Sequence, residues 1–559
     1  MIGADLVAHA LKAHGVTFIS ALVGNGINPV LFSARQAGIK VVDTRNEQTA
    51  SFMAESYGRF TCRVGVCAVS SGGGHTNALS GLVNAHLGNA PMLLISGCSD
   101  HNLTDRGKFQ DFVDQVAMAA PVTKYARLVD RPEKIPFYIH EALAHSVAGT
   151  PGPVHLTIPE DVLDADVSND LITPISAATN AIVEQRCVGD SRLIEEAASA
   201  IAAAERPLMV AGNGVFYAHG EDALAEFAAI ADIPVVVPIW DRGSIPNPIP
   251  QFMGVIGSAS GSPDILQDAD LVLILGAQVD YRLGFLQPPA VRADAKVIRV
   301  DIDPLRLRQA TDPHIAILGD PRSVLEQLSA RLQGVSMPAH ADWLEEARNR
   351  DMDFRERWRG SAIRWDAPAN GLALVEAIRP FVQGDAIFLV DGGNIGQWMH
   401  MVLCDRYPGH WMTCGASGVV GYGLGAAMAA RIAYPSRPVI LLSGDGSMGF
   451  NIADLESAVR QKLPFVAVVA DDRAWGITVS NQLVQYGSEN MVGCTLGAIR
   501  FDLAAEAFGA IGVRVENPRE IGAAIERALA ADRPTLIQVP VLHGGPADSQ
   551  TLSASVECC

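Results

Sequence analysis

The sequence predicts an α/β protein built from three doubly wound parallel-sheet domains in series. Short apolar runs of strand length alternate with longer helical segments, and this alternation predicts parallel strands joined by helices that cover both faces of each sheet. A stretch of weak periodicity and, further on, a polar helix with its connection divide the alternation into three units. The 559 residues also exceed what one hydrophobic core organises, at roughly 150 residues per domain.

The first domain is predicted to span residues 1–163, and its pattern opens with a helix over Asp5–His14. Its expected strands are Phe18–Val23, Val64–Val69, Met92–Ser96 and Val154–Ile158. The segment Asp164–Arg186 is rich in Ser, Thr, Asn and Pro and lacks periodicity, so it is interpreted as a linker.

The central domain is predicted at residues 187–332 and the third at residues 369–545, with a polar helix and connection over Gln333–Pro368 between them. The expected strands of the central domain are Leu208–Ala211, Val235–Val237, Leu271–Leu275 and Val297–Val300. Those of the third domain are Ala386–Val390, Val439–Leu442, Phe465–Val469 and Thr535–Val539. Both units repeat the alternation of the first domain, so the same architecture is predicted three times.

Composition and charge exclude several classes of protein. Charged residues make up 18% of the chain and apolar residues 49%, which is typical of compact globular domains. The formal charge of −19 leaves no basic surface for nucleic acid or for an anionic membrane. No stretch reaches the ~18 to 20 apolar residues of a membrane span, and no secretory signal pattern is present. We therefore expect a cytoplasmic enzyme with small-molecule partners, whose nine scattered cysteines are reduced.

Two acidic residues follow neighbouring predicted strands of the third domain. Asp445 lies in a Ser-Gly-Asp-Gly-Ser run directly after one strand, and Asp472 follows the next strand along the chain. The carboxyl ends of adjacent parallel strands meet at one sheet edge, where ligands bind. Mg²⁺ needs about six hard oxygens, which the two carboxylates, the carbonyl of Ala474, two phosphate oxygens and a water would supply. For either motif alone, an Asp-turn or a solvated acidic loop is the simpler interpretation.

This spacing resembles the signature of thiamine-diphosphate enzymes of the acetolactate synthase-like superfamily, a Gly-Asp-Gly run followed by a paired Asn-Asn or Asn-Asp. The resemblance implies that Asp445 and Asp472 bind the magnesium ion that holds the diphosphate of the cofactor. Here the pair is Asp471-Asp472. The additional acid places more negative charge beside the diphosphate, so the metal affinity is expected to differ from that of the common form.

A second part of the resemblance lies in the first domain, where Arg45-Asn46-Glu47 precedes a predicted helix over Ala50–Arg59. In the superfamily, an Arg-His-Glu segment lies at this place, and its Glu protonates N1′ of the aminopyrimidine ring of the cofactor. The resemblance therefore implies that Glu47 is the activating catalytic residue. Burial beside an apolar helix is expected to raise the pKa of this carboxyl, which suits proton sharing near neutrality. The simpler alternative is that Glu47 only interacts with the helix dipole.

The resemblance assigns the other cofactor contacts to the third domain. The Gly418 carbonyl is expected to accept from the 4′-amino group of the pyrimidine, and Val420 is expected to support the two rings where a bulkier residue is usual. The full set of expected cofactor contacts in this domain is Gly393, Asn394, Gly418, Val420, Gly444, Asp445, Gly446, Ser447, Asp472, Ala474, Trp475, Gly476 and Ile477. Thiamine diphosphate and Mg²⁺ are the predicted cofactors.

The glycine turn Ser71–Gly74 and the run Asp114–Pro121 look most like benzaldehyde lyase, a member that splits and joins acyloins. By this resemblance Gln110 reaches the reaction centre and is a catalytic candidate. The expected substrate pocket consists of Asn25, Gly26, His75, Gln110 and Cys414.

Two histidines of benzaldehyde lyase are replaced here by Gly26 and Cys414, so the substrate or the proton transfer is expected to differ. Cys414 is interpreted as a packing residue rather than a nucleophile, because no activating base lies near it in the sequence. For His75, a structural and a functional role both stay open.

In the central domain, Gly276–Arg282 and Val300–Asp303 resemble the middle domain of the superfamily, which binds FAD or the ADP part of coenzyme A in some members and is empty in others. Gln278 stands where nucleotide-binding members commonly have Arg. The missing phosphate partner favours an empty domain. Three arginines keep a coenzyme A ligand open: Arg282, Arg306 and Arg308.

The resemblance implies a carbon–carbon lyase or carboligase that acts on acyloins, aldehydes or 2-keto acids. Within the class, the alternative is a 2-hydroxyacyl-CoA lyase or an oxalyl-CoA decarboxylase-like enzyme. Outside it, the alternatives are a nicotinamide dehydrogenase and a catalytically inactive homologue. The glycine run at residues 421–425 does not follow a clear strand, and the retained Glu47 argues against inactivity. Because sites in this superfamily form between the first domain of one subunit and the third domain of another, a homodimer or homotetramer is expected.

Overall fold

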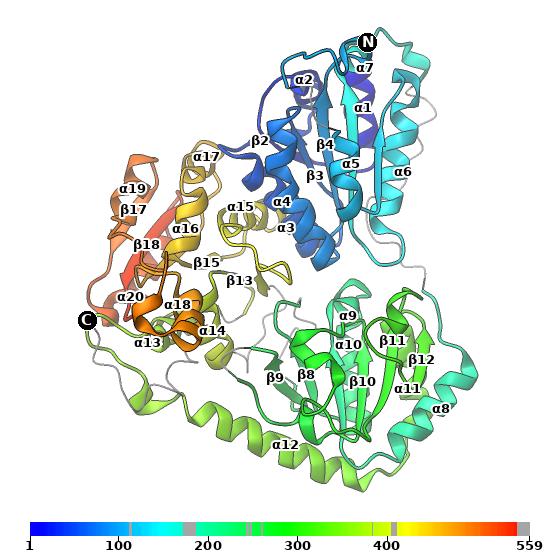
Figure 1. The fold of residues 1–559 in the computed structure, drawn as a ribbon, viewed down its shortest axis with the longest axis vertical. Helices are drawn as coiled ribbons and strands as arrows, with labels where there is room; N and C mark the ends of the chain where they lie inside the picture. The colour runs from blue at the N-terminus through cyan, green and yellow to red at the C-terminus, as the bar shows by residue number, and fades with distance from the viewer. Residues whose placement is uncertain are drawn as a thin grey trace.

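The part of the chain that the structure describes folds into three parallel sheets of six strands, each with flanking helices. The structure is a computed structural model that describes residues 1–110, 114–171, 186–241, 245, 249–258, 261–382, 384–403 and 411–544. In Figure 1 the first domain (blue to cyan) lies at the upper right, the central domain (green) at the lower right, and the third domain (yellow to red) at the left. The predicted α/β class with three doubly wound domains is confirmed.

The first sheet has the strand order β2-β1-β3-β4-β6-β5. Its strands are β1 (Phe18–Ala21), β2 (Lys40–Asp43), β3 (Gly65–Val69), β4 (Met92–Cys98), β5 (Tyr125–Leu128) and β6 (Pro153–Pro159). Its helices are α1 (Gly3–Ala13), α2 (Asn28–Gln36), α3 (Glu47–Thr61), α4 (Gly73–Gly88), α5 (Gln115–Ala119), α6 (Ile135–Val147) and α7 (Glu160–Asp164). Because all neighbouring strands run parallel, the loops before α3 and α4 leave from the same edge of the sheet.

The central sheet has the order β12-β11-β10-β7-β8-β9. Its strands are β7 (Pro207–Ala211), β8 (Val235–Pro238), β9 (Phe252–Ile256), β10 (Leu271–Leu275), β11 (Lys296–Asp301) and β12 (Ile315–Leu318). Its helices are α8 (Ser191–Ala202), α9 (Asn213–Tyr217), α10 (Glu221–Ala231) and α11 (Pro321–Leu332). All five residues of β10 are buried, as a continuous apolar run inside a parallel sheet predicts.

The third sheet has the order β14-β13-β15-β16-β18-β17. Its strands are β13 (Ile387–Asp391), β14 (Trp411–Thr413), β15 (Val439–Gly444), β16 (Val466–Asp471), β17 (Ile511–Arg514) and β18 (Thr535–Pro540). Its helices are α13 (Gly371–Ile378), α14 (Gly393–Leu403), α15 (Gly423–Ala433), α16 (Asp445–Asn451), α17 (Asp454–Arg460), α18 (Gly476–Tyr486), α19 (Phe501–Ala507) and α20 (Ile521–Leu529). The central strands β15 and β16 are neighbours, which positions the turns that follow them.

Helix α3 joins the first domain to the third domain of the same chain. It packs against α15 so closely that a Cβ on Gly425 would lie 2.9 Å from the Thr49 carbonyl oxygen, a distance that only glycine tolerates. Further along α3, the buried Arg59 pairs with Glu55, and its Nη1 donates to the Thr413 carbonyl at 2.8 Å. The two domains therefore form one packed unit, with α3 at their contact.

The connections between the domains match the expected positions in part. Of the predicted linker Asp164–Arg186, residues 172–185 lie outside the described part of the chain. The polar helix expected after residue 333 is α12 (Pro338–Glu356), which runs along the lower side of the molecule from the central toward the third domain (Figure 1). Within the described residues, every helix is too short or too polar to span a membrane.

Candidate functional site

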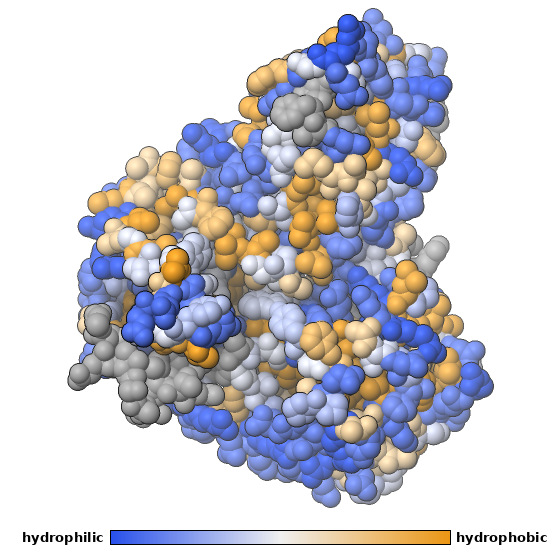
Figure 2. All heavy atoms as spheres, in the orientation of Figure 1, coloured by the Kyte–Doolittle hydropathy of each residue, from blue (hydrophilic) through white to orange (hydrophobic). Residues whose placement is uncertain are grey.

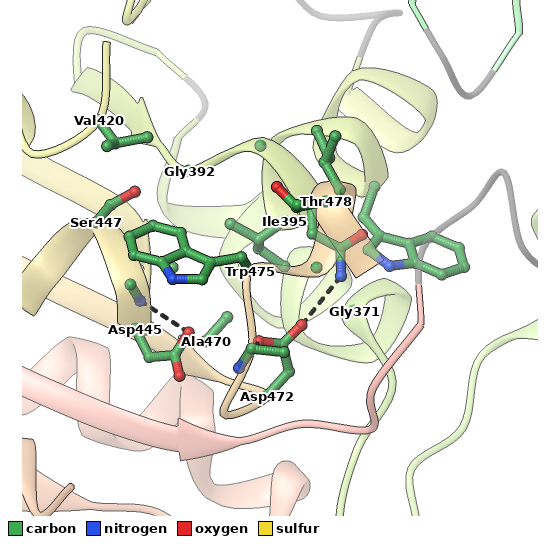
Figure 3. A pocket seen from close by; sticks show the side chains of 18 of the residues that line it. Gly371, Gly392, Ile395, Val420, Asp445, Ser447, Ala470, Asp472, Trp475 and Thr478 are labelled. Carbon is green, nitrogen blue, oxygen red and sulfur yellow. Dashed lines mark hydrogen bonds between the residues drawn. The ribbon is translucent and has the colours of Figure 1, made fainter. Parts of the chain in front are cut away.

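A pocket of about 300 Å³ lies at the carboxyl edge of the third sheet. Residues at the ends of β13, β15 and β16 and in the first turns of α14, α16 and α18 surround it (Figure 3). The predicted residues that line it are Gly393, Asn394, Cys414, Gly418, Val420, Gly444, Asp445, Gly446, Ser447, Asp472, Ala474, Trp475, Gly476 and Ile477. Every third-domain position predicted to contact cofactor, metal or substrate therefore borders one pocket.

Asp445 and Asp472 lie at the same end of this pocket because their strands are neighbours. Gly444, the last residue of β15, pairs with Ala470 of β16, so the turns that follow leave the sheet side by side. Asp445 Oδ1 accepts from the next backbone N–H at 2.8 Å. Asp472 Oδ2 accepts from Asn394 Nδ2 at 3.1 Å (Figure 3). The sheet order thus brings together two acids that are distant in the sequence.

The environment of the two carboxyl groups disfavours their negative charge. Burial raises the pKa of Asp445 to about 7, and the adjacent Asp472 carboxylate adds to this rise. Burial also raises the pKa of Asp472, against the hydrogen bond from Asn394. In the described part of the chain no Lys or Arg pairs with either acid, and His543 Nδ1 lies 3.8 Å from Asp472 Oδ2. A divalent cation between the two groups would favour their ionised forms.

The donor set fits magnesium only in combination with a phosphorylated ligand. Across the described ranges there is no group of three or more His, Cys, Asp or Glu side chains that could hold a metal ion by itself. Magnesium is usually bound by one or two carboxylates, while phosphate oxygens and waters complete its octahedral shell. A pair of carboxyl groups at one end of this pocket matches that chemistry when the ligand supplies the phosphate oxygens.

Glycines provide the space beside these acids. A Cβ on Gly393 would lie 2.3 Å from Ile477 Cδ1, and one on Gly446 would lie 2.6 Å from Trp475 Cζ3, so a side chain at either position would displace one of these neighbours. Gly418 is different, because a Cβ there would meet nothing within 4 Å. Its φ of +66° is in the left-handed region, and this backbone conformation favours glycine at that position.

A buried acid that the sequence did not reveal, Asp391, holds the loop before α15. Its carboxylate accepts from the N–H of Gly421 at 3.2 Å and from the N–H of Gly423 at 2.8 Å. Burial raises the pKa of Asp391 to about 6, and these hydrogen bonds oppose the rise. The Tyr422 hydroxyl donates to the Val390 carbonyl at 2.8 Å. Together these contacts fix the end of the loop that carries two predicted cofactor contacts.

Cys414 borders the pocket but is only 8% exposed. Burial raises the pKa of its thiol to about 12, with a further contribution from Asp391. Because the thiolate is the nucleophilic form of cysteine, this thiol is unreactive near neutral pH. The structure supports its interpretation as a packing residue.

The first-domain candidates gather around the glycine turn, outside this pocket. Glu47 Oε2 accepts from Asn77 Nδ2 at 3.0 Å, and a Cβ on Gly74 would lie 3.3 Å from Glu47 Oε1. Ser71 Oγ donates to Gln110 Oε1 at 3.4 Å. Glu47 is half-buried rather than buried as expected, and neither Glu47 nor Gln110 lines the third-domain pocket.

The structure corrects the predicted pocket positions of His75 and Gly26. His75 is fully buried, its Nδ1 lies 2.9 Å from Ser96 Oγ, and burial lowers its pKa to about 4. It is therefore a neutral histidine of the domain core. Gly26 is buried against Gly97, where a Cβ on either residue would lie within 3.4 Å of the other backbone, so it provides close packing rather than pocket surface. Asn25 is exposed, and its carbonyl accepts from the backbone of the glycine turn at 3.4 Å.

Other residues of the pocket were not predicted. They are Trp240, Gly371, Val390, Gly392, Ile395, Trp398, Val419, Ala470, Thr478, Val541, Leu542 and Gly544. Most of them adjoin predicted positions or strand ends, so the rule that ligands bind at the carboxyl edge of the sheet could have identified them. Trp240 belongs to the central domain, and no local pattern marks it. Among the described lining residues, Asp445 and Asp472 are the only ones with a charged side chain.

Three family models match the chain, one in each domain. The model described as thiamine pyrophosphate enzyme, N-terminal TPP binding domain, matches residues 1–118. The corresponding central-domain model matches residues 194–328. The model of the C-terminal TPP binding domain matches residues 391–539, which include the glycine turns and both acids of the pocket.

Similar proteins of known name match over nearly the whole chain. The chain is 28% identical over 553 residues to 2-hydroxyacyl-CoA lyase 1 of Homo sapiens, covering 96% of this chain and 94% of that protein. It is 29% identical over 544 residues to the acetolactate synthase isozyme 1 large subunit of Escherichia coli strain K12, with the same coverage of 96% and 94%. With the isozyme 2 large subunit of that strain it shares 28% identity over 547 residues, or 97% of this chain and 96% of that protein.

Proposed function

Because this chain belongs to the thiamine-diphosphate-dependent enzymes of the acetolactate synthase-like superfamily, we propose that its third-domain pocket holds the cofactor through Mg²⁺. The enzyme is a lyase or carboligase. In the proposed site Asp445, Asp472 and the Ala474 carbonyl are the protein ligands of the metal. The observation that carries this proposal is the pair of buried carboxyl groups at one end of the pocket, which no Arg or Lys of the described residues neutralises.

When bound, thiamine diphosphate supplies a nucleophilic carbon that adds to a carbonyl group. The protein binds and orients this group and moves protons near it. The glycines 393, 444 and 446 leave space for the diphosphate, and the loop fixed by Asp391 presents Gly418 and Val420 to the pyrimidine end. Glu47 of a second subunit holds a proton at N1′ of the pyrimidine, and Gln110 of that subunit contacts the reacting carbonyl group.

We propose acyloins, aldehydes or 2-keto acids as substrates. The pocket lining favours uncharged carbonyl compounds over 2-keto acids. Among the described lining residues, the only charged side chains are Asp445 and Asp472, the two proposed metal ligands. A substrate carboxylate would find no cationic partner among the described residues that line the pocket. The likeness to benzaldehyde lyase stays a prediction from motifs.

A second candidate is a 2-hydroxyacyl-CoA lyase, as one of the similar proteins is named. Arg282, one of the arginines that kept this option open, is 3% exposed and pairs with Asp241 and Asp280. Arg306 donates to Asn89 at 2.8 Å. These contacts leave fewer free cations for the phosphates of coenzyme A, so we favour the first candidate. Protection of the central domain from proteolysis by ADP would reverse this preference.

We further propose that the active site forms across a subunit boundary in a homodimer or homotetramer. Glu47 does not line the pocket of its own chain. Helix α18, which borders the pocket, has no buried residue although it carries apolar side chains, and Val484 is 77% exposed. Phe450 of α16 is 49% exposed, and Figure 2 shows apolar side chains on this part of the third domain. Apolar surface of this kind is typical of subunit contacts.

Mixing two inactive variants tests the shared site. Glu47→Gln and Asp445→Ala subunits are unfolded together, refolded and supplied with cofactor and Mg²⁺. If each site takes Glu47 from one subunit and Asp445 from the other, half of the dimers are hybrids with one intact site, and about a quarter of wild-type activity returns. Activity that stays at the level of the unmixed variants would refute the shared site. Wild-type protein refolded in the same way is the control.

A further inference from the structure

Trp240 alone, among the described residues that line the pocket, comes from the central domain. It follows β8 and reaches the third domain, where it packs half-buried beside the ring of His400 on α14. The ring centroids are 5.7 Å apart and the planes are nearly perpendicular, at 82°. Ligand pockets occur preferentially at domain interfaces, so a side chain from a second domain is placed to contact the ligand.

The backbone of Trp240 has a φ of +75°, in the left-handed region that a large side chain rarely adopts. Such a conformation persists only where surrounding contacts determine it, and it is concentrated at functional sites. Glycine would adopt the same conformation without strain. This backbone conformation, together with the place of Trp240 in the pocket lining, favours a functional role for the indole.

The contacts that impose this conformation come from the buried guanidinium of Arg282. Its Nη1 donates to the Ile239 carbonyl at 2.8 Å and to Asp241 Oδ1 at 2.5 Å, the two residues on either side of Trp240. Its other nitrogens are held by Asp280, with Nη2 to Oδ2 at 2.8 Å. One rigid cation thus fixes the chain before and after the tryptophan.

The position of the indole places it away from the metal end. His400 lies seven residues after Gly393 on α14, which corresponds to about 10 Å along a helix axis. The His400 ring is buried, and burial lowers its pKa to about 3, so the surface behind Trp240 is uncharged. The indole N–H donates to the Tyr281 hydroxyl at 3.2 Å, which leaves the aromatic face for contact with a ligand.

We infer that Trp240 is a specificity-determining residue whose indole forms a wall against the apolar substituent of the carbonyl substrate. Arg282 is the positioning residue that holds this wall in place. The inference rests on the proposed function, because it needs a thiamine-diphosphate site in the same pocket. It assigns the central domain a part in substrate choice that does not depend on any nucleotide.

The test compares the cleavage of benzoin and of acetoin by the holoenzyme. Trp240→Gly removes the indole and suits the left-handed backbone, so this variant is expected to fold. We expect its ratio of kcat/KM for benzoin over acetoin to fall at least about tenfold, which is the scale of lost apolar contacts in a binding pocket. Trp240→Phe should keep most of the ratio, and cofactor retention should not change in either variant. Phe285→Ala, which removes a 53% exposed central-domain aromatic outside the pocket, is the matched control.

Arg282→Lys tests the positioning role, because lysine keeps the charge but cannot make the same set of contacts. It should reproduce the shift in the substrate ratio, and combining it with Trp240→Gly should add nothing further. A ratio unchanged in Trp240→Gly with cofactor retained would overturn the inference and leave the proposed function standing. A wild-type protein that does not retain thiamine diphosphate would overturn both.

Discussion

The first and third domains bury their ionisable groups in opposite ways. In the third domain Asp445 and Asp472 are buried together, and burial raises the pKa of both. In the first domain His75 and His155 are buried together, with ring centroids 4.7 Å apart, and burial lowers the pKa of both. Burial disfavours charge in each pair, but the two pairs reach neutrality by different routes.

The difference separates a pair of buried neutral bases from a pair of acids that is suited to bind a cation. The histidines become neutral by losing protons, and Ser96 Oγ lies 2.9 Å from His75 Nδ1 and 3.1 Å from His155 Nε2. Burial favours the protonated, neutral form of both aspartates, whereas a cation between them would favour their ionised forms. A metal ion would therefore stabilise the acid pair, whereas the two histidines share the Ser96 hydroxyl and are neutral at pH 7.

Glu47 belongs to neither kind of cluster. It is half-buried at the start of α3, bonded to Asn77, and outside the pocket formed by its own chain. In the proposed site, the carboxyl ligands of the metal come from one chain, and Glu47 acts on the cofactor of a second subunit. A substitution of Glu47 should therefore reduce turnover, whereas a substitution of a proposed metal ligand should reduce cofactor binding.

The largest effect is expected from Glu47→Gln. Glutamine keeps the size of the side chain and an oxygen for Asn77 but cannot hold a proton at N1′ of the cofactor. We expect kcat to fall by about 10³-fold, the middle of the range for general acid–base catalysis, while cofactor binding changes little. Steady-state kinetics at saturating cofactor and equilibrium dialysis measure the two quantities. Glu133→Gln, an exposed first-domain change, is the control, and near-normal turnover of Glu47→Gln would remove the activation argument.

Asp445→Ala should instead act on cofactor retention. Removing a ligand is expected to weaken Mg²⁺ binding by about 100-fold or more, since even second-layer partners of metal ligands cost 10 to 100-fold. Cofactor retained through gel filtration at increasing MgCl₂ concentrations measures this effect, with Asp385→Ala on the exposed surface of the third domain as control. EDTA should strip the wild-type enzyme reversibly. Retention that does not depend on Mg²⁺ would contradict the metal assignment.

The sheets show which parts of the fold were accessible from sequence. The predicted strands are the four inner strands of each sheet, and the missed ones are all edges: β2, β5, β9, β12, β14 and β17. Inner strands are buried on both faces and read as continuous apolar runs such as Leu271–Leu275. Edge strands such as Tyr125–Leu128 alternate with exposed residues or, like Trp411–Thr413, are too short to produce a pattern.

The site residues also divide into those that a local sequence pattern reveals and those whose contacts are distant in the sequence. Asp445 and Asp472 were predictable because each directly follows an inner strand, and strand order then places them together. Asp391 also ends an inner strand, but its partners Gly421 and Gly423 are distant in sequence. For Trp240 the contact arises between domains, so local pattern carries no information about it.

A smaller effect should appear in the pH dependence of stability of the first domain. The folded-state pKa of His75, about 4, lies below its ordinary 6.5, so the unfolded chain takes up the proton first as pH falls. The contribution of neutral His75 to the free energy of unfolding is on the order of 3 kcal/mol. It is complete above about pH 6.5 and is lost as the pH falls toward 4. In His75→Gln, melting temperatures at about pH 5 and pH 7 should therefore lie closer together than in the wild type. An equal separation in both proteins would refute this role.

Asp391 should make the folding stability depend on pH with the opposite sign, again at acidic pH. Its folded-state pKa of about 6 lies above the ordinary 3.8, so the folded chain holds the proton longer, and stability falls as pH rises through this interval. The ordinary and folded-state pKa values of Asp391 differ slightly less than those of His75, so the change in stability is expected to be smaller. Asp391→Asn removes it, and the melting temperature should then rise more steeply from about pH 4 to pH 6 than in the wild type. General destabilisation would lower all melting temperatures alike, so opposite changes of slope in the two variants identify buried base and buried acid as the sources. Parallel slopes would show that these groups do not control the pH dependence.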